Sequence, residues 1–275
     1  MKVQTAIKRL TVKDPSNTWL KHSLWLKKYI KWRLLVKREY EVNGDTRGTF
    51  LGIIQNYKRP YNTQPIVLSL LATPAIGQVI VSNNNPRCDI NRWFNLKHKN
   101  VKIIEQEKEC STAERFRIAR NNHSEFYLAI DDDLFLTPLQ LQKICDSLIA
   151  NPKTPHGICG QSMQEDGSFI YNIHGKDCPV DGINRLYAFT NDHLKEFFRI
   201  TEQLGITEES DMWYKSLWDD MAISMSGYGK PCCLNVDEYL DCPTQSNHSA
   251  AWKQKGFFEY RENFYKRLIS AKYSK

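Results

Sequence analysis

Three consecutive aspartates, Asp131, Asp132 and Asp133, directly follow the apolar run from Phe126 to Ile130. A short run rich in aromatic and branched residues is typical of a buried β-strand. Adjacent carboxylates at the end of a strand repel one another, and a neighbouring cation relieves that repulsion. Divalent metal ions prefer oxygen ligands of this kind, so we expect a metal site here. The alternative is a solvated acidic turn. We consider it the weaker interpretation, because a surface loop rarely needs three acids directly after so apolar a strand.

The direction of the side chains separates the roles of the three acids. On an extended chain Asp131 and Asp133 point to one side and Asp132 points to the other. The pattern is therefore an Asp-x-Asp pair at the carboxyl end of a strand, where open α/β sheets bind ligands. We expect Asp133 to bind the metal, Asp131 to lie near the metal or a ribose, and Asp132 to hold its neighbours by hydrogen bonds.

Strands and helices alternate around the triplet, with strands expected at 50–57, 78–82 and 101–104 and helices at 112–122 and 137–150. This alternation predicts a parallel, doubly wound sheet for residues 49–150. The strands end in polar residues: Gln55 and Arg59 after the first, Asn83 and Asn84 after the second. Carboxyl ends of parallel strands share one edge, which suits a nucleotide site, although asparagines also serve simply to satisfy turns. Neither Gly-x-Gly-x-x-Gly nor Gly-x-x-x-x-Gly-Lys occurs, which disfavours dinucleotide-binding and P-loop sites.

The second half, residues 151–275, is more irregular, with strands expected at 158–161, 186–190 and 232–236 and helices at 192–203 and 252–265. Between them Asp219 and Asp220 precede a helix with a methionine-rich side. The helix dipole alone would explain acids at this position. The functional alternative is a carboxylate that meets an acceptor hydroxyl as a base or as an electrostatic stabiliser, while a metal neutralises a departing nucleoside diphosphate. Only one of the two acids can face the site, and we favour Asp220.

Residues 1–48 are predicted to be a basic helical extension of a main domain at 49–275, which divides into nucleotide-binding (49–150) and acceptor (151–275) halves. From Ser16 to Val42 there is no glycine or proline, and the apolar clusters suit one long helix or two short ones. We favour packing of the apolar stripe on the main domain, and a peripheral contact with a membrane surface is the alternative. The polar side carries Lys21, Lys27, Lys28, Lys31, Arg33, Lys37 and Arg38.

Composition bounds the remaining possibilities. The net charge of +7 and a pI near 8.9 favour anionic partners without choosing among them. The eight cysteines are scattered and form no Cys-x-x-Cys pair, so we expect reduced thiols rather than a zinc site. The sequence contains no apolar run of about 18 residues, the length needed to span a membrane. The N-terminus also lacks the apolar core of a signal peptide, so we expect a cytoplasmic protein.

Six segments, in order along the chain, resemble the exostosin-like glycosyltransferases of the GT-A fold. They are 54–59, 79–84, 112–117, 129–133, 219–222 and 246–261. This resemblance implies an α/β fold with a Rossmann-like, mostly parallel sheet flanked by helices. It also implies a uridine diphosphate (UDP) sugar as donor and Mn²⁺ (or Mg²⁺) as cofactor.

The resemblance assigns roles to named residues. The nucleotide side would comprise Gln55, Tyr57, Arg59, Asn83, Asn84, Arg115, Arg120, Asp131 and Asp132. Asp133, with Asp131 beside it, would hold the metal. Asp220, with Asp219 as the second choice, would stand at the acceptor, and Arg261 would approach the departing diphosphate. A lone histidine such as His248 is more often structural than a ligand.

The chain also departs from the family. Trp218 and Phe264 stand where the family has a cysteine pair, so that disulfide is absent, which agrees with a reducing compartment. Ala119 replaces an arginine, and the adjacent Arg120 can substitute for it. Arg185 stands where the family has a small residue beside the sugar, and a more filled pocket suits a smaller sugar such as xylose. Together with the missing membrane anchor, these differences lead us to expect a cytosolic enzyme from a bacterium or a virus.

The leading hypothesis is a metal-dependent glycosyltransferase that moves xylose or an N-acetylhexosamine type of sugar from a UDP-sugar to a hydroxyl of a glycan acceptor. The resembled family retains anomeric configuration, but the residues themselves fit either outcome. A metal-dependent phosphotransferase or nuclease is an alternative, because clustered acids on a basic protein also cut phosphodiesters. The second alternative is a basic binding protein without catalytic activity. We expect no nucleic-acid partner, and the sequence does not indicate an oligomeric state.

Overall fold

The computed structural model describes residues 15–44, 48–166, 168–207, 218–246, 251–253 and 255–273. Its α-helices are α2 (Pro15–Asn43), α3 (Pro60–Leu71), α4 (Glu114–Asn121), α5 (Pro138–Ala150), α6 (Asn191–Gln203), α8 (Asp219–Ser224) and α9 (Phe257–Tyr273). Its longer strands are β1 (Phe50–Asn56), β2 (Ile76–Asn83), β3 (Val101–Glu105), β4 (Phe126–Asp131), β7 (Cys159–Met163), β8 (Phe169–Ile173) and β11 (Leu186–Thr190). Short strands are β5 (Leu134–Phe135), β6 (His156–Gly157), β9 (Cys178–Pro179), β10 (Gly182–Asn184), β12 (Cys232–Cys233) and β13 (Leu240–Asp241).

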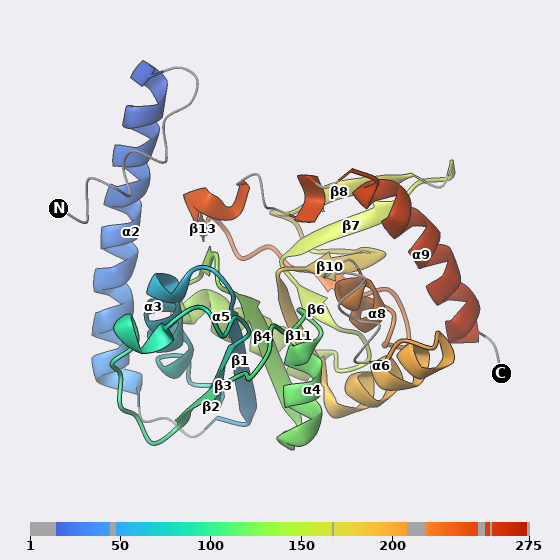
Figure 1. Cartoon of the computed structure of the whole chain (residues 1–275), viewed down its shortest axis with the longest axis horizontal. Coiled ribbons are helices and arrows are strands. Elements are labelled where there is room, and N and C mark those ends of the chain that lie inside the picture. The colour runs from blue at the N-terminus through green and yellow to red at the C-terminus, as the bar shows by residue number, and fades with distance from the viewer. Residues whose placement is uncertain are drawn as a thin grey trace.

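An eight-stranded sheet with the order β3-β2-β1-β4-β11-β6-β12-β9 forms the centre of the molecule (Figure 1). Strands β3, β2, β1 and β4 are parallel, as predicted, and β11 lies antiparallel beside β4. The register places Gln55 of β1 level with Asp131 of β4 on one side and with Ser82 of β2 on the other. The polar ends of these strands therefore meet at one edge of the sheet.

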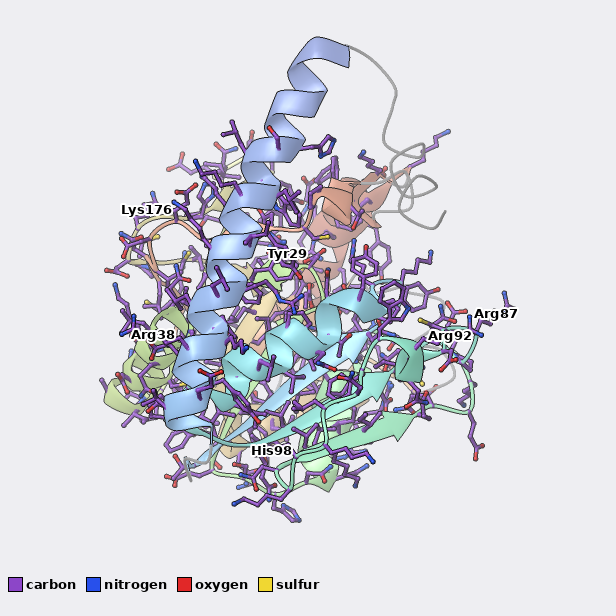
Figure 2. The ribbon with its side chains drawn as sticks, turned by 90° about the vertical axis from the view of Figure 1, so that its left-hand side faces the viewer. Tyr29, Arg38, Arg87, Arg92, His98 and Lys176 are labelled. Carbon is purple, nitrogen blue, oxygen red and sulfur yellow. The ribbon has the colours of Figure 1, made fainter. Side chains whose placement is uncertain are left out.

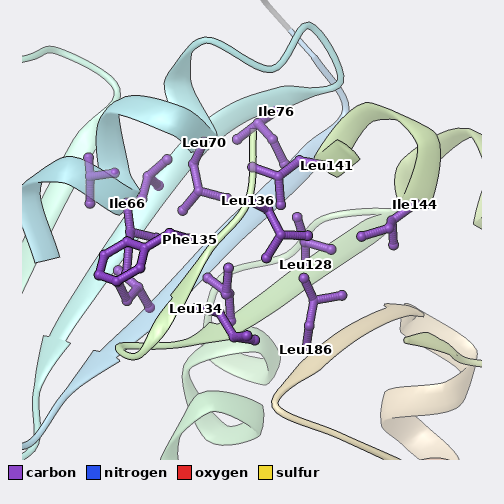
Figure 3. Packing of buried hydrophobic residues seen from close by; sticks show 14 of the residues in the cluster. Ile66, Leu70, Ile76, Leu128, Leu134, Phe135, Leu136, Leu141, Ile144 and Leu186 are labelled. Atoms are coloured by element: carbon purple, nitrogen blue, oxygen red, sulfur yellow. The ribbon is translucent and has the colours of Figure 1, made fainter. Parts of the chain in front are cut away.

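Helices cover both faces of this sheet, and β4 shows why its sequence is apolar throughout. Leu128 and Ile130 pack on one face with residues of α3 and α5, and Tyr127 and Ala129 pack on the other with residues of α4, α6, α8 and α9. Figure 3 shows the first of these clusters. A strand that is buried on both faces needs apolar side chains at successive positions. The expected buried strand before the acids is thus present.

Helix α5 fixes the chain that leaves the triplet. Thr137 caps it: its hydroxyl oxygen accepts from the Gln140 backbone N–H (3.3 Å), and the Gln140 side chain accepts from the Thr137 N–H (2.9 Å). This reciprocal pair is a capping box, and Pro138 occupies the first turn, where its missing N–H costs nothing. The helix expected at 137–150 is thus confirmed.

The N-terminal extension is one helix, α2, where the sequence left open one or two. Trp25, Tyr29 and Trp32 lie on the side of α2 that faces the domain, where the rings of Tyr29 and Trp32 stand 5.0 and 5.1 Å from the ring of Phe135. The indole N–H of Trp25 donates to the Asp241 backbone carbonyl (2.7 Å). The apolar stripe thus packs on the main domain, as expected. No described helix is both long and apolar enough to cross a membrane.

In the second half the strand β8 was not predicted, and two of the predicted elements have other bounds. The strand expected at 232–236 is only the two-residue β12. The C-terminal helix begins at Phe257 rather than at Trp252, because Gly256 adopts a left-handed φ of 79°, which interrupts the helix. Strands of both halves enter the central sheet, and the division at residue 150 stays a prediction. Residues 208–217, 247–250 and 254 lie outside the described part, and with them His248 and much of the resemblance at 246–261.

His193 makes the stability of the fold depend on pH. It is buried in the first turn of α6, where its Nδ1 accepts from the Thr190 N–H (3.1 Å) and so completes a capping box. Burial lowers the pKa of His193 to about 4, a shift that the neighbouring His156 reinforces and the Lys153 carbonyl opposes. Below pH 6.5 this histidine therefore binds a proton in the unfolded chain but stays neutral in the folded chain. The free energy of unfolding consequently falls as the pH is lowered.

We predict that His193→Gln removes this dependence, because glutamine is a usual partner in a capping box. Between pH 7 and pH 5 the wild-type protein should lose about 2 kcal/mol more free energy of unfolding than the variant. Urea titrations at the two pH values measure the difference. His174→Gln, at an exposed histidine, should keep the wild-type dependence. Equal losses in wild type and His193→Gln would contradict the assignment.

Candidate functional site

Each aspartate of the triplet pairs with an arginine. Asp131 ends β4 and accepts from Arg115 of α4 (Oδ1 to Nη1, 2.7 Å). Asp132 accepts from Arg59, the residue before α3 (Oδ1 to Nη1, 2.7 Å), and its other oxygen accepts from the Tyr57 N–H (3.3 Å). Asp133 accepts from Arg185, the residue before β11 (Oδ1 to Nη2, 3.0 Å). The cationic partners that the sequence required are thus supplied, in this structure, by three separate elements.

Positive charge remains favourable at this edge. Burial raises the pKa of Asp132 to about 6, and Arg59 opposes that shift while Asp133 adds to it. Burial also raises the pKa of Asp131, with Arg115 in opposition. Because burial penalises a charged carboxylate, an additional cation beside the triplet would stabilise its ionised form.

Arg185 also belongs to this cluster of charged residues, and the sequence did not predict that it pairs with the aspartates. Its guanidinium bridges Asp133 and Asp241 (Nη2 to Oδ1, 2.8 Å for the latter). Its backbone has a left-handed φ of 67°, its carbonyl accepts from the Asp131 N–H (2.9 Å), and its own N–H donates to the Tyr187 hydroxyl (3.0 Å). A strained backbone that is held on both sides is often found where a side chain must be aimed. Only the antiparallel pairing of β11 with β4 brings Arg185 to the acids.

The strand-end amides differ in their freedom to bind a ligand. Gln55 is buried, and both polar atoms of its side chain have no hydrogen-bond partner within the described residues. Asn83 accepts from Asn56 (2.8 Å) and donates to Glu105 (2.7 Å), while Asn84 accepts from Ser82 (2.7 Å). Buried polar groups normally have partners, so Gln55 is the amide of this edge that lacks one. The side chains of Asn83 and Asn84 thus have partners within the protein, and a role of theirs in binding a nucleotide stays a prediction.

The other residues predicted on the nucleotide side lie in different surroundings. The Tyr57 hydroxyl donates to Glu109, and burial, reinforced by Glu109, raises the pKa of Tyr57 to about 12. The guanidinium of Arg120 lies over the ring of Phe198 (3.9 Å to the centroid), in a hollow between α4 and α6. The contacts of Arg120 therefore do not join it to the aspartates, whereas those of Arg59 and Arg115 do.

A second acidic pair lies at the start of α8. Asp219 accepts from the Thr112 hydroxyl (2.8 Å), and Asp220 forms a two-point ion pair with Arg261 of α9 (3.0 and 2.7 Å). Gln161 of β7, which sequence reasoning missed, accepts from the same guanidinium (2.9 Å). Both acids are buried, and the expectation that only one of them faces the site stays a prediction. A buried two-point pair fixes the orientation of both partners.

Arg115 connects the two acidic pairs. Its Nη1 bonds to Asp131, and its Nε lies 3.9 Å from Asp219. Asp131 and Asp219 are far apart in sequence but contact one guanidinium, so the acids after β4 and the acids at the start of α8 lie close together. Trp218 and Phe264, the two positions at the family's cysteine pair, also lie together, with ring centroids 6.4 Å apart.

No protein-family model and no curated protein sequence matches this chain. Many solved structures are similar in fold, including the following two. One is CMP:2-keto-3-deoxy-manno-octonic acid synthetase complexed with CTP, with a TM-score of 0.48 and 11% identity over 74% of this chain and 98% of that one. The other is GalNAc-T7 with UDP, GalNAc and Mn²⁺, with a TM-score of 0.51 and 9% identity over 71% of this chain and 44% of that one.

At these identities the likeness concerns the fold alone. It confirms the predicted class: this chain has a GT-A fold, with a mostly parallel sheet flanked by helices and a helical N-terminal extension. This chain also spans less than half of the GalNAc-T7 chain. The closer kinship with the exostosin-like enzymes stays a prediction.

The triplet suits a metal that is held only partly by protein. In the described chain no group of three or more His, Cys, Asp or Glu side chains is arranged to hold a metal ion. Mg²⁺ and similar ions are often bound by one or two carboxylates, with phosphate oxygens of a substrate completing the shell. Asp133 and Asp131 fit that second arrangement. Both lie at the edge of the sheet where the parallel strands end, and their carboxylates form ion pairs with arginine side chains.

We predict that Arg115→Met destabilises the fold by about 3 kcal/mol, because it leaves the buried Asp219 and the half-buried Asp131 beside an apolar side chain. Arg120→Met, on the same helix, should cost about 1 kcal/mol or less, since it loses a cation–π contact at an exposed residue. Urea unfolding measures both. The double variant Arg115→Met/Asp131→Asn should recover part of the loss, and strictly additive effects would contradict the pairing.

Proposed function

We propose that this protein is a metal-dependent glycosyltransferase that moves a sugar from a UDP-sugar to a hydroxyl of a glycan acceptor. The observation that carries the proposal is the contact of Arg115 with both Asp131 and Asp219. A transferase needs a cationic donor end and a second carboxylate on the acceptor side within one site. The GT-A fold supports the same assignment, and the GalNAc-T7 structure, which holds UDP and Mn²⁺, is a precedent for these ligands on this fold.

On the donor side, Asp133 with Asp131 would hold Mn²⁺ or Mg²⁺ together with the diphosphate. When bound, the metal neutralises the charge that develops on the departing nucleoside diphosphate. The guanidinium groups of Arg59 and Arg185 contact the carboxylate of Asp133 (3.4 and 3.0 Å), so both would lie close to a diphosphate held there. The unpartnered amide of Gln55 is suited to bind the nucleotide.

On the acceptor side, the Asp220–Arg261 pair would act electrostatically. Both carboxylate oxygens of Asp220 accept from Arg261, and Oδ1 also accepts from the Met221 N–H (2.9 Å). A carboxylate engaged in this way is poorly placed to take a proton until the arginine moves. Asp220 would therefore aim Arg261, and Gln161 would support it, so that the guanidinium stabilises charge in the transition state. This arrangement favours the retaining outcome of the resembled family.

The donor sugar would be xylose or an N-acetylhexosamine. The long side chain of Arg185 takes up room at a position that the resemblance places beside the sugar. A pentose lacks the hydroxymethyl group that would compete for this room, so xylose is the better fit. A panel of UDP-sugars with Mn²⁺, measured by release of UDP, tests the choice, and NMR of the product defines the linkage.

We predict that Asp133→Ala abolishes Mn²⁺-dependent binding of UDP and lowers transfer by at least about 100-fold, the scale of losing a group that stabilises transition-state charge. Isothermal titration with UDP, with and without Mn²⁺, measures the binding. Asp166→Ala, at an exposed loop aspartate, is the matched control and should behave as wild type. Undiminished transfer in Asp133→Ala, full wild-type activity in chelator, or metal-dependent cleavage of nucleic acid would overturn the proposal.

We predict that Asp220→Asn separates donor binding from turnover. The affinity for UDP with Mn²⁺ should stay within about threefold, whereas kcat should fall by at least about 100-fold, because the interaction matters only in the transition state. Retained UDP binding also shows that the variant is folded. Gln161→Glu, which keeps an acceptor for Arg261, should retain most of the activity. A loss confined to KM would instead assign Asp220 to acceptor binding.

A further inference from the structure

Helix α2 has a second apolar side, opposite the one that packs on the domain. Leu26, Ile30 and Leu34 are spaced by four residues and so form one row along the helix. Their exposed fractions are 51%, 50% and 65%. Surface helices of soluble proteins normally carry polar residues on their outer side. A contiguous row of large aliphatic side chains there marks an interaction surface.

Basic residues surround this row. Lys27, Lys31 and Arg38 follow it on one side of the helix and Arg33 and Lys37 on the other, and all five are exposed, with Lys37 paired to the exposed Glu41 (3.8 Å). Beyond the first three lies a second group of exposed aliphatic residues, Leu24, Leu35 and Val42. We name the exposed face formed by these aliphatic and basic residues the outer face of α2. In Figure 2 it faces the viewer along the length of the helix, with the domain behind it.

We propose that the outer face of α2 docks on an anionic lipid membrane surface. Aliphatic side chains would enter the boundary between headgroups and acyl chains, and the long basic side chains would reach the anionic headgroups beside them. The charges also argue against a second copy of this chain as occupant, because two such faces would bring like charges together. Residues 1–14 add Lys2, Lys8, Arg9 and Lys13 against a single acid, Asp14, to the same end of the chain.

This surface is tied to the candidate site. The indole of Trp25, on the inner side of α2, donates to the backbone carbonyl of Asp241, and the carboxylate of Asp241 pairs with Arg185. Docking of α2 would thus hold the donor end of the site in a fixed orientation to the membrane. An acceptor glycan carried by the membrane would then meet a site already oriented toward it.

Co-sedimentation with vesicles tests the inference. The probe is the full chain with vesicles of phosphatidylcholine alone and of phosphatidylcholine mixed with phosphatidylserine. The wild-type protein should bind the mixed vesicles, bind the neutral ones at least tenfold more weakly, and dissociate as salt is raised. Because the readout is binding alone, it is independent of any transferase activity.

Two sets of variants localise the binding. Ile30→Ser/Leu34→Ser and Lys27→Gln/Lys31→Gln/Arg38→Gln should each weaken binding at least tenfold. The matched controls are Leu139→Ser, at an exposed leucine of α5, and Lys102→Gln/Lys143→Gln/Lys266→Gln, at exposed lysines elsewhere, and they should bind as wild type. Absence of vesicle binding, or equal binding by the α2 variants and their controls, overturns the proposal. A dimer that these α2 variants dissociate in sedimentation would assign the outer face to a second copy instead.

Discussion

Three adjacent carboxylates at the end of one buried strand are the constraint on which the site depends. Their mutual repulsion and their desolvation both disfavour the ionised state. In the structure each aspartate forms an ion pair with a different arginine. These are Arg115 of α4, Arg59 directly before α3 and Arg185 directly before β11. Each arginine ties a different element to the carboxyl end of β4. The acidic cluster thereby helps to fix the positions of the surrounding elements, although buried ion pairs of this kind contribute little net stability on their own.

The sheet makes this convergence possible. Because β1, β2 and β4 are parallel and nearly in register, their carboxyl ends lie level, and Gln55 and Asp131 become neighbours. Strand β11 enters antiparallel, so its beginning rather than its end reaches the same edge, and Arg185 arrives with it. The helices of both faces then supply partners from outside the sheet. Asp219, at the start of α8, is joined to this edge through Arg115.

Local patterns in the sequence predicted much of this arrangement. The apolar run before Asp131 indicates a buried strand, and Thr137 followed by Pro138 indicates the start of α5, because capping depends only on nearby residues. Arg185 could not be predicted in the same way. Its partners Asp133 and Asp241 become neighbours only through the pairing of distant strands, and its left-handed backbone belongs to a residue type that seldom adopts it. Gln161 was missed for a related reason, since β7 reaches Arg261 only through long-range packing.

The ion pairs also bear on how a metal and a nucleotide would enter the proposed site. A metal ion alone would have to displace Arg185 and Arg59 from Asp133, which would leave Arg185 paired only with Asp241 and Arg59 paired only with Asp132. A diphosphate alone would bring further negative charge to an edge where four carboxylates, those of Asp131, Asp132, Asp133 and Asp241, share the three guanidinium groups of Arg59, Arg115 and Arg185. If both enter together, Asp133 would hold the metal and the guanidinium groups of Arg59 and Arg185 would bind phosphate oxygens, so each ligand would offset charge that the other brings. If the proposed function holds, these ion pairs would therefore favour joint binding of the metal and the nucleotide, because each ligand would lower the electrostatic penalty of the other.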